Sequence, residues 1–406
     1  MKYKSCSLLM GGIEFRYNGI ALCQRVDHIG GGDIVVQTYD DKTDKDFHFN
    51  IDTFLEKQNE IIEQNKTGKI YHKCVGCLEL KEEEWPDGED IKLDQIIFHH
   101  WTKCNSHCIY CYTNKDKKYF NTRKSYKIFP ILKELAKKDK FRFGGLCCFA
   151  GGEISCLKEF KDIVNLLDKY DFSYIFNSSC VQFERIVEER LKKGNGVLIV
   201  STDCGNRELH KKIKQVDTFN AVWKNIARYS KAAKDHKDMI FTKYIVLKDI
   251  NDNEQAITEF LQMSKNCGIE TVLMEIDHYF FLENRNNVPK YIIDLFYFAF
   301  EKAKEMGLNC KIYSNACVLL LQGQWADEFW RPYVFVSGDG IEKYSQRRVY
   351  KKSEDGTVEE YYNITEAARE NNLKYSDIWK ICEKNKNSRR KKVLNGNIYS
   401  YSYDFR

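Results

Sequence analysis

Three cysteines lie within one stretch of eight residues, at Cys104, Cys108 and Cys111, and no fourth cysteine is close by. Three thiolates can ligate three irons of a four-iron cubane and leave the fourth iron without a protein ligand, whereas an electron-transfer cluster normally uses four cysteines. The C-x3-C-x2-C spacing therefore predicts a [4Fe-4S] cluster with one open iron, at which chemistry can take place.

Two apolar runs set the context of these cysteines. The run 96–101 indicates a buried strand that ends at the cysteine loop, and the run 146–150 indicates a second strand, followed by Gly151, Gly152 and Glu153. A cysteine loop after the first strand and Gly-Gly-Glu after the second resemble the radical SAM superfamily, over residues 91–335.

The resemblance implies an activity and its cofactors. In that family S-adenosylmethionine chelates the open iron, and one electron from the cluster cleaves its sulfonium to a 5′-deoxyadenosyl radical. The cofactors carry the difficult chemistry, so the protein has to position them and exclude water. A reducing partner such as flavodoxin or ferredoxin is implied as well.

The resemblance also implies positions for the groups that hold S-adenosylmethionine. Gly151 and Gly152 let the backbone approach the methionine amino group, Glu153 accepts from that ammonium, and Tyr110 lies against the adenine. For Tyr110, packing of the loop is the alternative.

Two more groups are carried over from the resemblance. Ser201 and Asp203, which follow the apolar run 197–200, are expected at the ribose, with capping of the loop as the alternative. Lys243 lies inside a largely apolar strand pattern, where it must reach solvent or an anion such as the carboxylate of S-adenosylmethionine.

Strand and helix patterns alternate from about residue 94 to 317. Strands separated by helices imply parallel pairing through right-handed crossovers, with active groups at the carboxyl ends of the strands. The expected fold is α/β, a partial TIM-like (β/α)6 barrel over 91–335. We predict the strands at 96–101, 146–150, 173–179, 197–202, 240–247 and 271–276, and the helices at 128–138, 157–170, 183–193, 218–232, 253–265 and 292–306.

The first 90 residues are expected to form a small cysteine-rich domain. Cys6 and Cys23 flank a predicted hairpin with an Asn18-Gly19 turn, and Cys74 and Cys77 follow on a later loop. The four thiols are similar to the auxiliary-cluster modules of SPASM-type radical SAM enzymes, although here they precede the barrel. The alternatives are a second [4Fe-4S] cluster and a structural zinc with four thiolate ligands.

The cysteine content indicates the cellular compartment in which the protein works. Sixteen cysteines without a secretory signal favour a reducing cytoplasm and metal use over a disulfide framework. No apolar run reaches the roughly 18 residues that would indicate a membrane span, so no membrane partner is expected.

All of the excess positive charge lies in the C-terminal module, 341–406. This module holds 15 Lys and Arg and 10 Asp and Glu. The whole chain holds 64 and 59, so residues 1–340 hold 49 basic and 49 acidic residues.

Within this module we predict a hairpin at 349–362, two short helices joined by a turn, and a basic run. This order resembles the nuclease-associated modular DNA-binding domain of homing endonucleases. The resemblance implies DNA contacts from residues on or beside the recognition helix, Ser376, Trp379 and Lys380. It also implies phosphate contacts from Arg389, Arg390, Lys391 and Lys392. A solvated basic tail or a protein-docking module is the alternative.

Two function classes follow. The first is a radical SAM enzyme brought to DNA by its tail, which modifies a nucleobase or nucleotide. The second is a radical SAM maturase of a peptide, saccharide or small molecule with a vestigial tail. A third class, a non-enzymatic iron-sulfur DNA-binding regulator, is disfavoured by Gly-Gly-Glu and the barrel pattern.

If the basic run contacts phosphates, Arg389→Ala and Lys391→Ala will weaken DNA binding equally across sequences. The slope of log K against log salt should fall by about one unit per lost contact. Titrations of duplexes of unrelated sequence at several salt concentrations measure this. Unchanged affinity and slope in both variants would contradict the phosphate assignment.

Overall fold

The computed structural model describes residues 2–23, 34–39, 48–77, 80–85, 91–111, 126–284, 287–313, 349–352, 357–361, 392–394 and 397–402. Its contacts divide the chain into two compact units, Met1–Ser337 and Gly338–Arg406. Each unit is described by itself.

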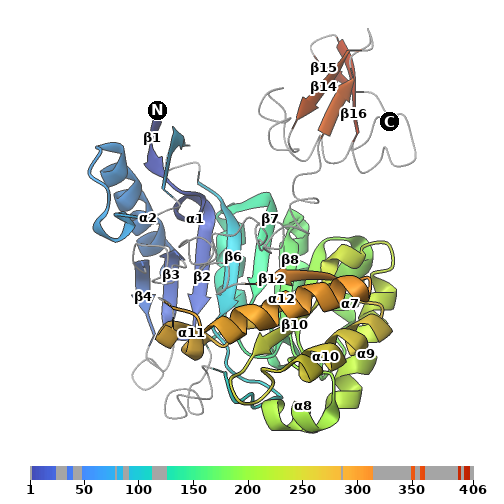
Figure 1. Ribbon diagram of the computed structural model, residues 1–406. Coiled ribbons are helices and arrows are strands. Elements are labelled where there is room, and N and C mark those ends of the chain that lie inside the picture. Colours follow the sequence, from blue (N-terminus) through green and yellow to red (C-terminus); the bar gives the residue numbers. More distant parts are fainter. Residues whose placement is uncertain are drawn as a thin grey trace. The chain divides into compact units, whose positions relative to one another are not determined.

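Seven parallel strands form the centre of the first unit, and they follow one another in the sheet in chain order (Figure 1). This confirms the predicted α/β fold with a parallel sheet. The six predicted strands correspond to β6 to β11. Strand β12 was not predicted, because its four residues are too short to form a clear apolar pattern. The strands are β6 (Leu93–His99), β7 (Phe141–Phe149), β8 (Ser173–Ser178), β9 (Gly196–Ser201), β10 (Ile240–Val246), β11 (Thr271–Ile276) and β12 (Asn309–Ile312).

Helices connect these strands and pack their apolar faces on the sheet. The ring of Phe149 in β7 packs against Phe160 of α6, and Tyr244 in β10 packs against Phe260 of α10. Asn206 caps α8, because its side-chain oxygen accepts from the Leu209 amide. The helices are α5 (Phe129–Lys137), α6 (Phe160–Leu167), α7 (Arg185–Lys193), α8 (Arg207–Lys214), α9 (Phe219–Ala232), α10 (Glu254–Asn266), α11 (His278–Asn284) and α12 (Lys290–Glu305).

The N-terminal segment extends the same sheet. Strand β2 (Gly12–Arg16) pairs in parallel with β6, and β3 (Gly19–Cys23) and β4 (Ile34–Thr38) continue outward as antiparallel neighbours. The predicted hairpin is present, but its turn residues are Tyr17 and Asn18, one position before the predicted Asn18-Gly19 turn, because Gly19 already pairs with Arg16. A separate ribbon joins β1 (Lys2–Ser5) to β5 (Lys81–Glu84), beside the helices α1 (Ser7–Gly11) and α2 (Ile51–Lys66).

The described part of the second unit is an antiparallel sheet in the order β14-β13-β16-β15. Strands β13 (Val349–Lys352) and β14 (Val358–Tyr361) form the predicted hairpin, and β15 (Lys392–Leu394) pairs with β16 (Asn397–Ser402). The predicted DNA contacts Ser376, Trp379, Lys380, Arg389, Arg390 and Lys391 lie outside the described residues, and Lys392 begins β15.

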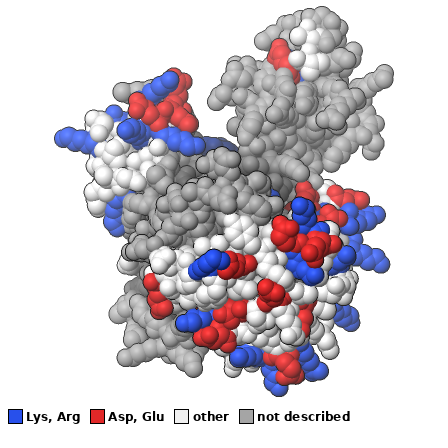
Figure 2. Space-filling view, in the orientation of Figure 1, with Lys and Arg blue, Asp and Glu red and all other residues white. Residues whose placement is uncertain are grey.

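The described surface of the face in Figure 2 carries charges of both signs, interspersed. This agrees with the equal numbers of basic and acidic residues before the C-terminal module. Within the described residues, no helix is long and apolar enough to cross a bilayer.

The Gly-Gly-Glu segment, residues 151–153, leaves β7 and runs against the chain that leads into the cysteine loop. The Gly152 amide donates to the Trp101 carbonyl at 2.8 Å, and the Glu153 amide donates to the Lys103 carbonyl at 3.0 Å. In return, the Trp101 indole nitrogen donates to the Glu153 carbonyl at 3.0 Å. These bonds fix the backbone directly before Cys104.

The two glycines allow this close approach. A Cβ on Gly151 would lie 2.7 Å from the Trp101 carbonyl oxygen, and one on Gly152 would overlap the Lys103 carbonyl oxygen. Both obstacles are backbone atoms, which cannot rotate away. The glycines are therefore required by contact with the cysteine loop, in addition to any contact with a cofactor.

We expect Gly152→Ala to destabilise the protein by about 1–3 kcal/mol, the usual cost of overpacking, and to reduce iron uptake because Lys103 must move. Urea unfolding and iron content after reconstitution measure the two effects. Lys158→Ala, at an exposed position nearby, is the control. A Gly152→Ala protein as stable and as iron-rich as this control would contradict the packing argument.

Candidate active site

The cysteine loop lies at the carboxyl end of β6, between the Gly-Gly-Glu segment and the end of α8. The Ser106 amide donates to the Cys104 sulfur at 3.4 Å, and the Cys111 amide donates to the Cys108 carbonyl at 3.1 Å. Among the residues that the structure describes, no three His, Cys, Asp or Glu side chains converge into a metal-binding group. All three thiol donors nevertheless come from this one loop.

The donor set suits a four-iron cluster, because three thiols on one loop supply three ligands and leave one iron open. Burial raises the pKa of Cys104 to about 12, and the nearby Glu153, Cys108 and Cys111 act in the same direction. Burial also raises the pKa of Cys108, although the Lys214 ammonium opposes it. These thiols stay protonated at neutral pH without a metal, so iron binding must release protons.

Glu153 is 3% exposed and is held by the end of β8. One carboxylate oxygen accepts from the Ser178 hydroxyl at 2.7 Å. The other accepts from the Ser179 amide at 2.7 Å and the Ser179 hydroxyl at 2.6 Å. Asn105 of the cysteine loop accepts from the same hydroxyl at 3.1 Å. Glu153 is thereby fixed beside the loop, and its contact with an ammonium stays a prediction.

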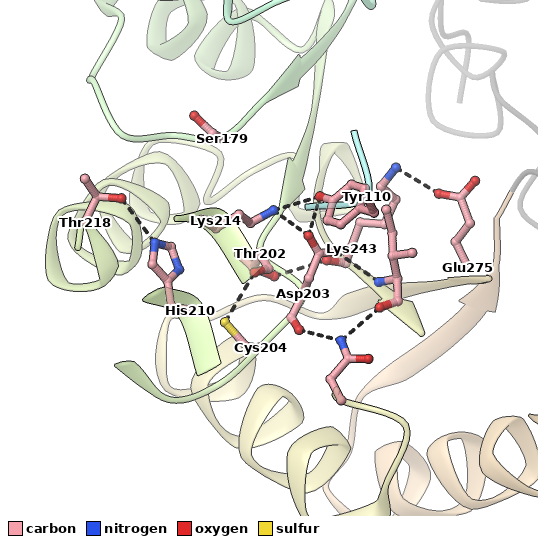
Figure 3. Close-up of polar contacts among 12 residues, drawn as sticks. Tyr110, Ser179, Thr202, Asp203, Cys204, His210, Lys214, Thr218, Lys243 and Glu275 are labelled. Atoms are coloured by element: carbon pink, nitrogen blue, oxygen red, sulfur yellow. Dashed lines mark hydrogen bonds and ion pairs between the residues drawn. The ribbon is translucent and has the colours of Figure 1, made fainter. Parts of the chain in front are cut away.

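The side chains of Tyr110, Asp203 and Lys214 meet one another (Figure 3). The Tyr110 hydroxyl donates to Asp203 Oδ2 at 2.5 Å, the Lys214 ammonium donates to the Tyr110 hydroxyl at 2.8 Å, and Lys214 also pairs with Asp203 Oδ2. Burial opposes the charge on Lys214, but the pKa of the amine is raised, chiefly because the Asp203 carboxylate lies beside it. Burial and Asp203 raise the pKa of the Tyr110 hydroxyl, which therefore stays protonated.

The remaining oxygen of Asp203 and its backbone are also engaged. Oδ1 accepts from the Ile245 amide at 3.0 Å, and the Asn251 side-chain nitrogen donates to the Asp203 carbonyl at 3.0 Å. Asp203 itself adopts the left-handed φ of 61°. Both carboxylate oxygens are therefore used inside the protein, and the predicted ribose contact of Asp203 would have to compete with these bonds.

Ser201 and Lys243 lie opposite each other on β9 and β10. The Lys243 ammonium donates to Glu275 Oε2 of β11 at 2.9 Å and lies 5.0 Å from the centre of the Tyr313 ring. The lysine in the apolar strand has thus found an anion, which is the carboxylate of Glu275. Its contact with S-adenosylmethionine, and that of Ser201, stay predictions.

The N-terminal cysteines occupy separate elements. Cys6 precedes α1, where its sulfur accepts from the Leu9 amide at 3.3 Å, and Cys23 ends β3. Cys74 ends the short helix η1 (His72–Cys74), and the Cys77 amide donates to its carbonyl at 3.1 Å. They too form no metal-binding group of three or more in the described part of the chain. A second cluster or zinc at these residues stays a prediction.

Sequence reasoning missed Lys214, Ser178 and Ser179. The two serines are the last residues of a predicted strand, at the carboxyl end where the polar groups of the fold gather, so their position was a usable signal. Lys214 stands in a run of lysines on a helix that was not predicted. Its one distinguishing sign is helical spacing, because it shares a buried face with His210 and Ile213 while Lys211 and Lys212 are exposed.

Comparison with known proteins finds a family match over part of the chain. Residues 98–261 match the sequence model of the Radical SAM superfamily, and proteins of curated function gave no match. Similar solved structures include Streptococcus suis SuiB bound to S-adenosylmethionine (11% identity, TM-score 0.43, 75% of this chain and 63% of that chain). Another is native anSMEcpe with bound AdoMet and the Cp18Cys peptide (16% identity, TM-score 0.38, 52% of this chain and 61% of that chain). A third is a radical SAM methyltransferase from Sphaerobacter thermophilus (11% identity, TM-score 0.37, 52% of this chain and 63% of that chain).

The chain spans less than two thirds of the length of each of these three structures. The matched segment contains Cys104, Cys108 and Cys111, the Gly-Gly-Glu segment, and strands β7 to β10 with their helices. The match to the Radical SAM superfamily, a family of enzymes, therefore falls on the part of the chain that the cysteine loop had indicated.

Proposed function

We propose that the chain cleaves S-adenosylmethionine reductively at a [4Fe-4S] cluster held by Cys104, Cys108 and Cys111. When bound, the cluster supplies the electron, and S-adenosylmethionine supplies the 5′-deoxyadenosyl radical. The observation that carries the proposal is the direct packing of Gly151, Gly152 and Glu153 against the cysteine loop, within the segment that matches the superfamily.

The chain's own residues hold and shield this site. The Gly-Gly-Glu segment fixes one end of the cysteine loop, and the Tyr110–Asp203–Lys214 contacts fix the other. Burial of Glu153 and Asp203 keeps water away from the polar groups beneath the loop. The protein thereby supplies a preorganised position for the cofactors.

The substrate class is proposed from the C-terminal module. Its net charge of +5, obtained as 15 minus 10, supports docking on a polyanion, and DNA or a nucleotide is the proposed substrate. A peptide, saccharide or small molecule processed without the tail is the alternative. We further propose that the enzyme works in the cytoplasm with a small reductant such as flavodoxin or ferredoxin.

Replacing Cys104, Cys108 and Cys111 together by alanine should abolish 5′-deoxyadenosine formation, because no neighbouring side chain replaces the three sulfurs. The assay is anaerobic reconstitution with iron and sulfide, followed by product analysis under dithionite. Cys267→Ala, directly after α10 and outside the cysteine loop, is the control. Undiminished product from the triple variant would refute the proposed cleavage site.

The same samples report on the N-terminal thiols. With a second four-iron cluster, the wild type should carry about eight irons and the triple variant about four. Stoichiometric zinc together with about four irons in the wild type would assign Cys6, Cys23, Cys74 and Cys77 to the structural metal instead.

Deleting residues 341–406 should spare S-adenosylmethionine cleavage in the absence of substrate. Every proposed cofactor contact lies in Met1–Ser337, which is a compact unit by its own contacts. Product formation by the truncated protein should match the full chain, while duplex DNA binding at low salt falls. Truncated protein that binds DNA as tightly as the full chain would favour the maturase alternative.

A further inference from the structure

Beneath the cysteine loop lies a buried cluster of polar side chains from three separate segments. Tyr110 comes from the loop, Asp203 from the end of β9, and Lys214 from the last turn of α8 (Figure 3). The side chains of Lys214 and Asp203 are 2% and 0% exposed. Tyr110 also packs against a buried apolar cluster, which is formed by Cys204, Ile213, Ile245 and Leu247, as do Ile109, Leu209 and Ile250.

Such a pair is a weak source of stability. Removing two charges from water costs about as much as their attraction returns, and a well-packed apolar replacement is often as stable. The Lys214–Asp203 pair is therefore better explained by the position that it gives to a neighbouring segment than by a gain in stability. The contacts of the pair show which segment that is.

The ordered segment is the part of the loop that carries Cys108 and Cys111. The His107 amide donates to the Lys214 carbonyl, and the Ile109 amide donates to the Ile213 carbonyl, each at 3.0 Å. The last turn of α8 therefore holds the loop in two ways. Its backbone carbonyls accept from the loop amides, and its Lys214 side chain donates to the Tyr110 hydroxyl. The Lys214 ammonium also lies 5.1 Å from the centre of the Tyr110 ring, which is a further contact between these two side chains.

The base of this cluster is rigid. Asp203 is fixed on β10 by the Ile245 amide, and Asn251 joins the Asp203 and Ile245 carbonyls through one side-chain nitrogen, at 3.0 and 2.9 Å. The Leu247 amide donates to the Asn251 oxygen at 2.7 Å. The loop is thus tied to the sheet itself.

We propose that Lys214 is a positioning residue for the iron-sulfur cluster, which with Asp203 holds Tyr110 and so sets the places of Cys108 and Cys111. The inference rests on the proposed function, because it assumes that these cysteines bind iron. Lys214 touches neither substrate nor cofactor in this role, and it acts through Tyr110 and the loop backbone.

Two variants test it in the full-length protein. Tyr110→Phe removes the hydroxyl and keeps the ring. The double variant Lys214→Met/Asp203→Asn removes both charges together, so no unpaired charge stays buried, and asparagine tolerates the left-handed backbone at 203. Lys212→Met, at an exposed position on the same helix, is the matched control.

After anaerobic reconstitution with iron and sulfide, we would measure the rate of iron loss to a chelator and the thermal unfolding midpoint. Both variants should lose iron about 10- to 100-fold faster than wild type, the usual effect of removing an outer-shell partner. Their unfolding midpoints should stay near that of wild type, and the control should match wild type in both measurements. Faster loss without lower stability separates positioning from a merely structural role.

Folded Tyr110→Phe protein that retains iron as long as wild type would overturn the inference, and it decides the matter alone if the double variant does not fold. Iron loss that rises only in proportion to a fall in the unfolding midpoint would also overturn it. Wild-type protein that takes up no iron would instead refute the proposed function.

Discussion

The Asp203 carboxylate is the interaction on which the site depends. It has no access to solvent, and its oxygens accept from Tyr110, Lys214 and the Ile245 amide. A buried carboxylate is tolerated only when its hydrogen bonds are satisfied and its charge is balanced. Loss of Lys214 alone would leave that charge unbalanced, so the loop, α8 and β10 are energetically coupled through one residue.

A second constraint acts on the other end of the loop and is steric. Gly151 and Gly152 allow backbone to lie against backbone at Trp101 and Lys103. Glu153 extends this contact to Ser178 and Ser179 at the end of β8. The loop is therefore held between β7–β8 on one side and β9–β10 on the other. Neighbouring parallel strands end at the same edge of the sheet, so residues separated by more than a hundred positions can serve one site.

This arrangement explains what could be predicted from the sequence. Cys104, Cys108, Cys111 and Gly-Gly-Glu were recognisable because their spacing is local, and the strands β6 to β11 because each is a bounded apolar run. Lys214 was not recognisable, because its role depends on its ion pair with Asp203. The helix that carries Lys214 is only eight residues long and was not predicted. The joining of β2 to β6 also escaped prediction, since a parallel contact of distant segments leaves no periodic trace in either strand.

The central claim is that the three cysteines hold a cluster with one iron free for S-adenosylmethionine. Electron paramagnetic resonance of the reduced, reconstituted protein tests it most directly, with and without S-adenosylmethionine. Direct binding to the open iron changes the electronic environment of the cluster, so the account predicts a shift in the g-values on addition. An unshifted spectrum at a saturating concentration, with the wild type fully loaded with iron, would contradict it.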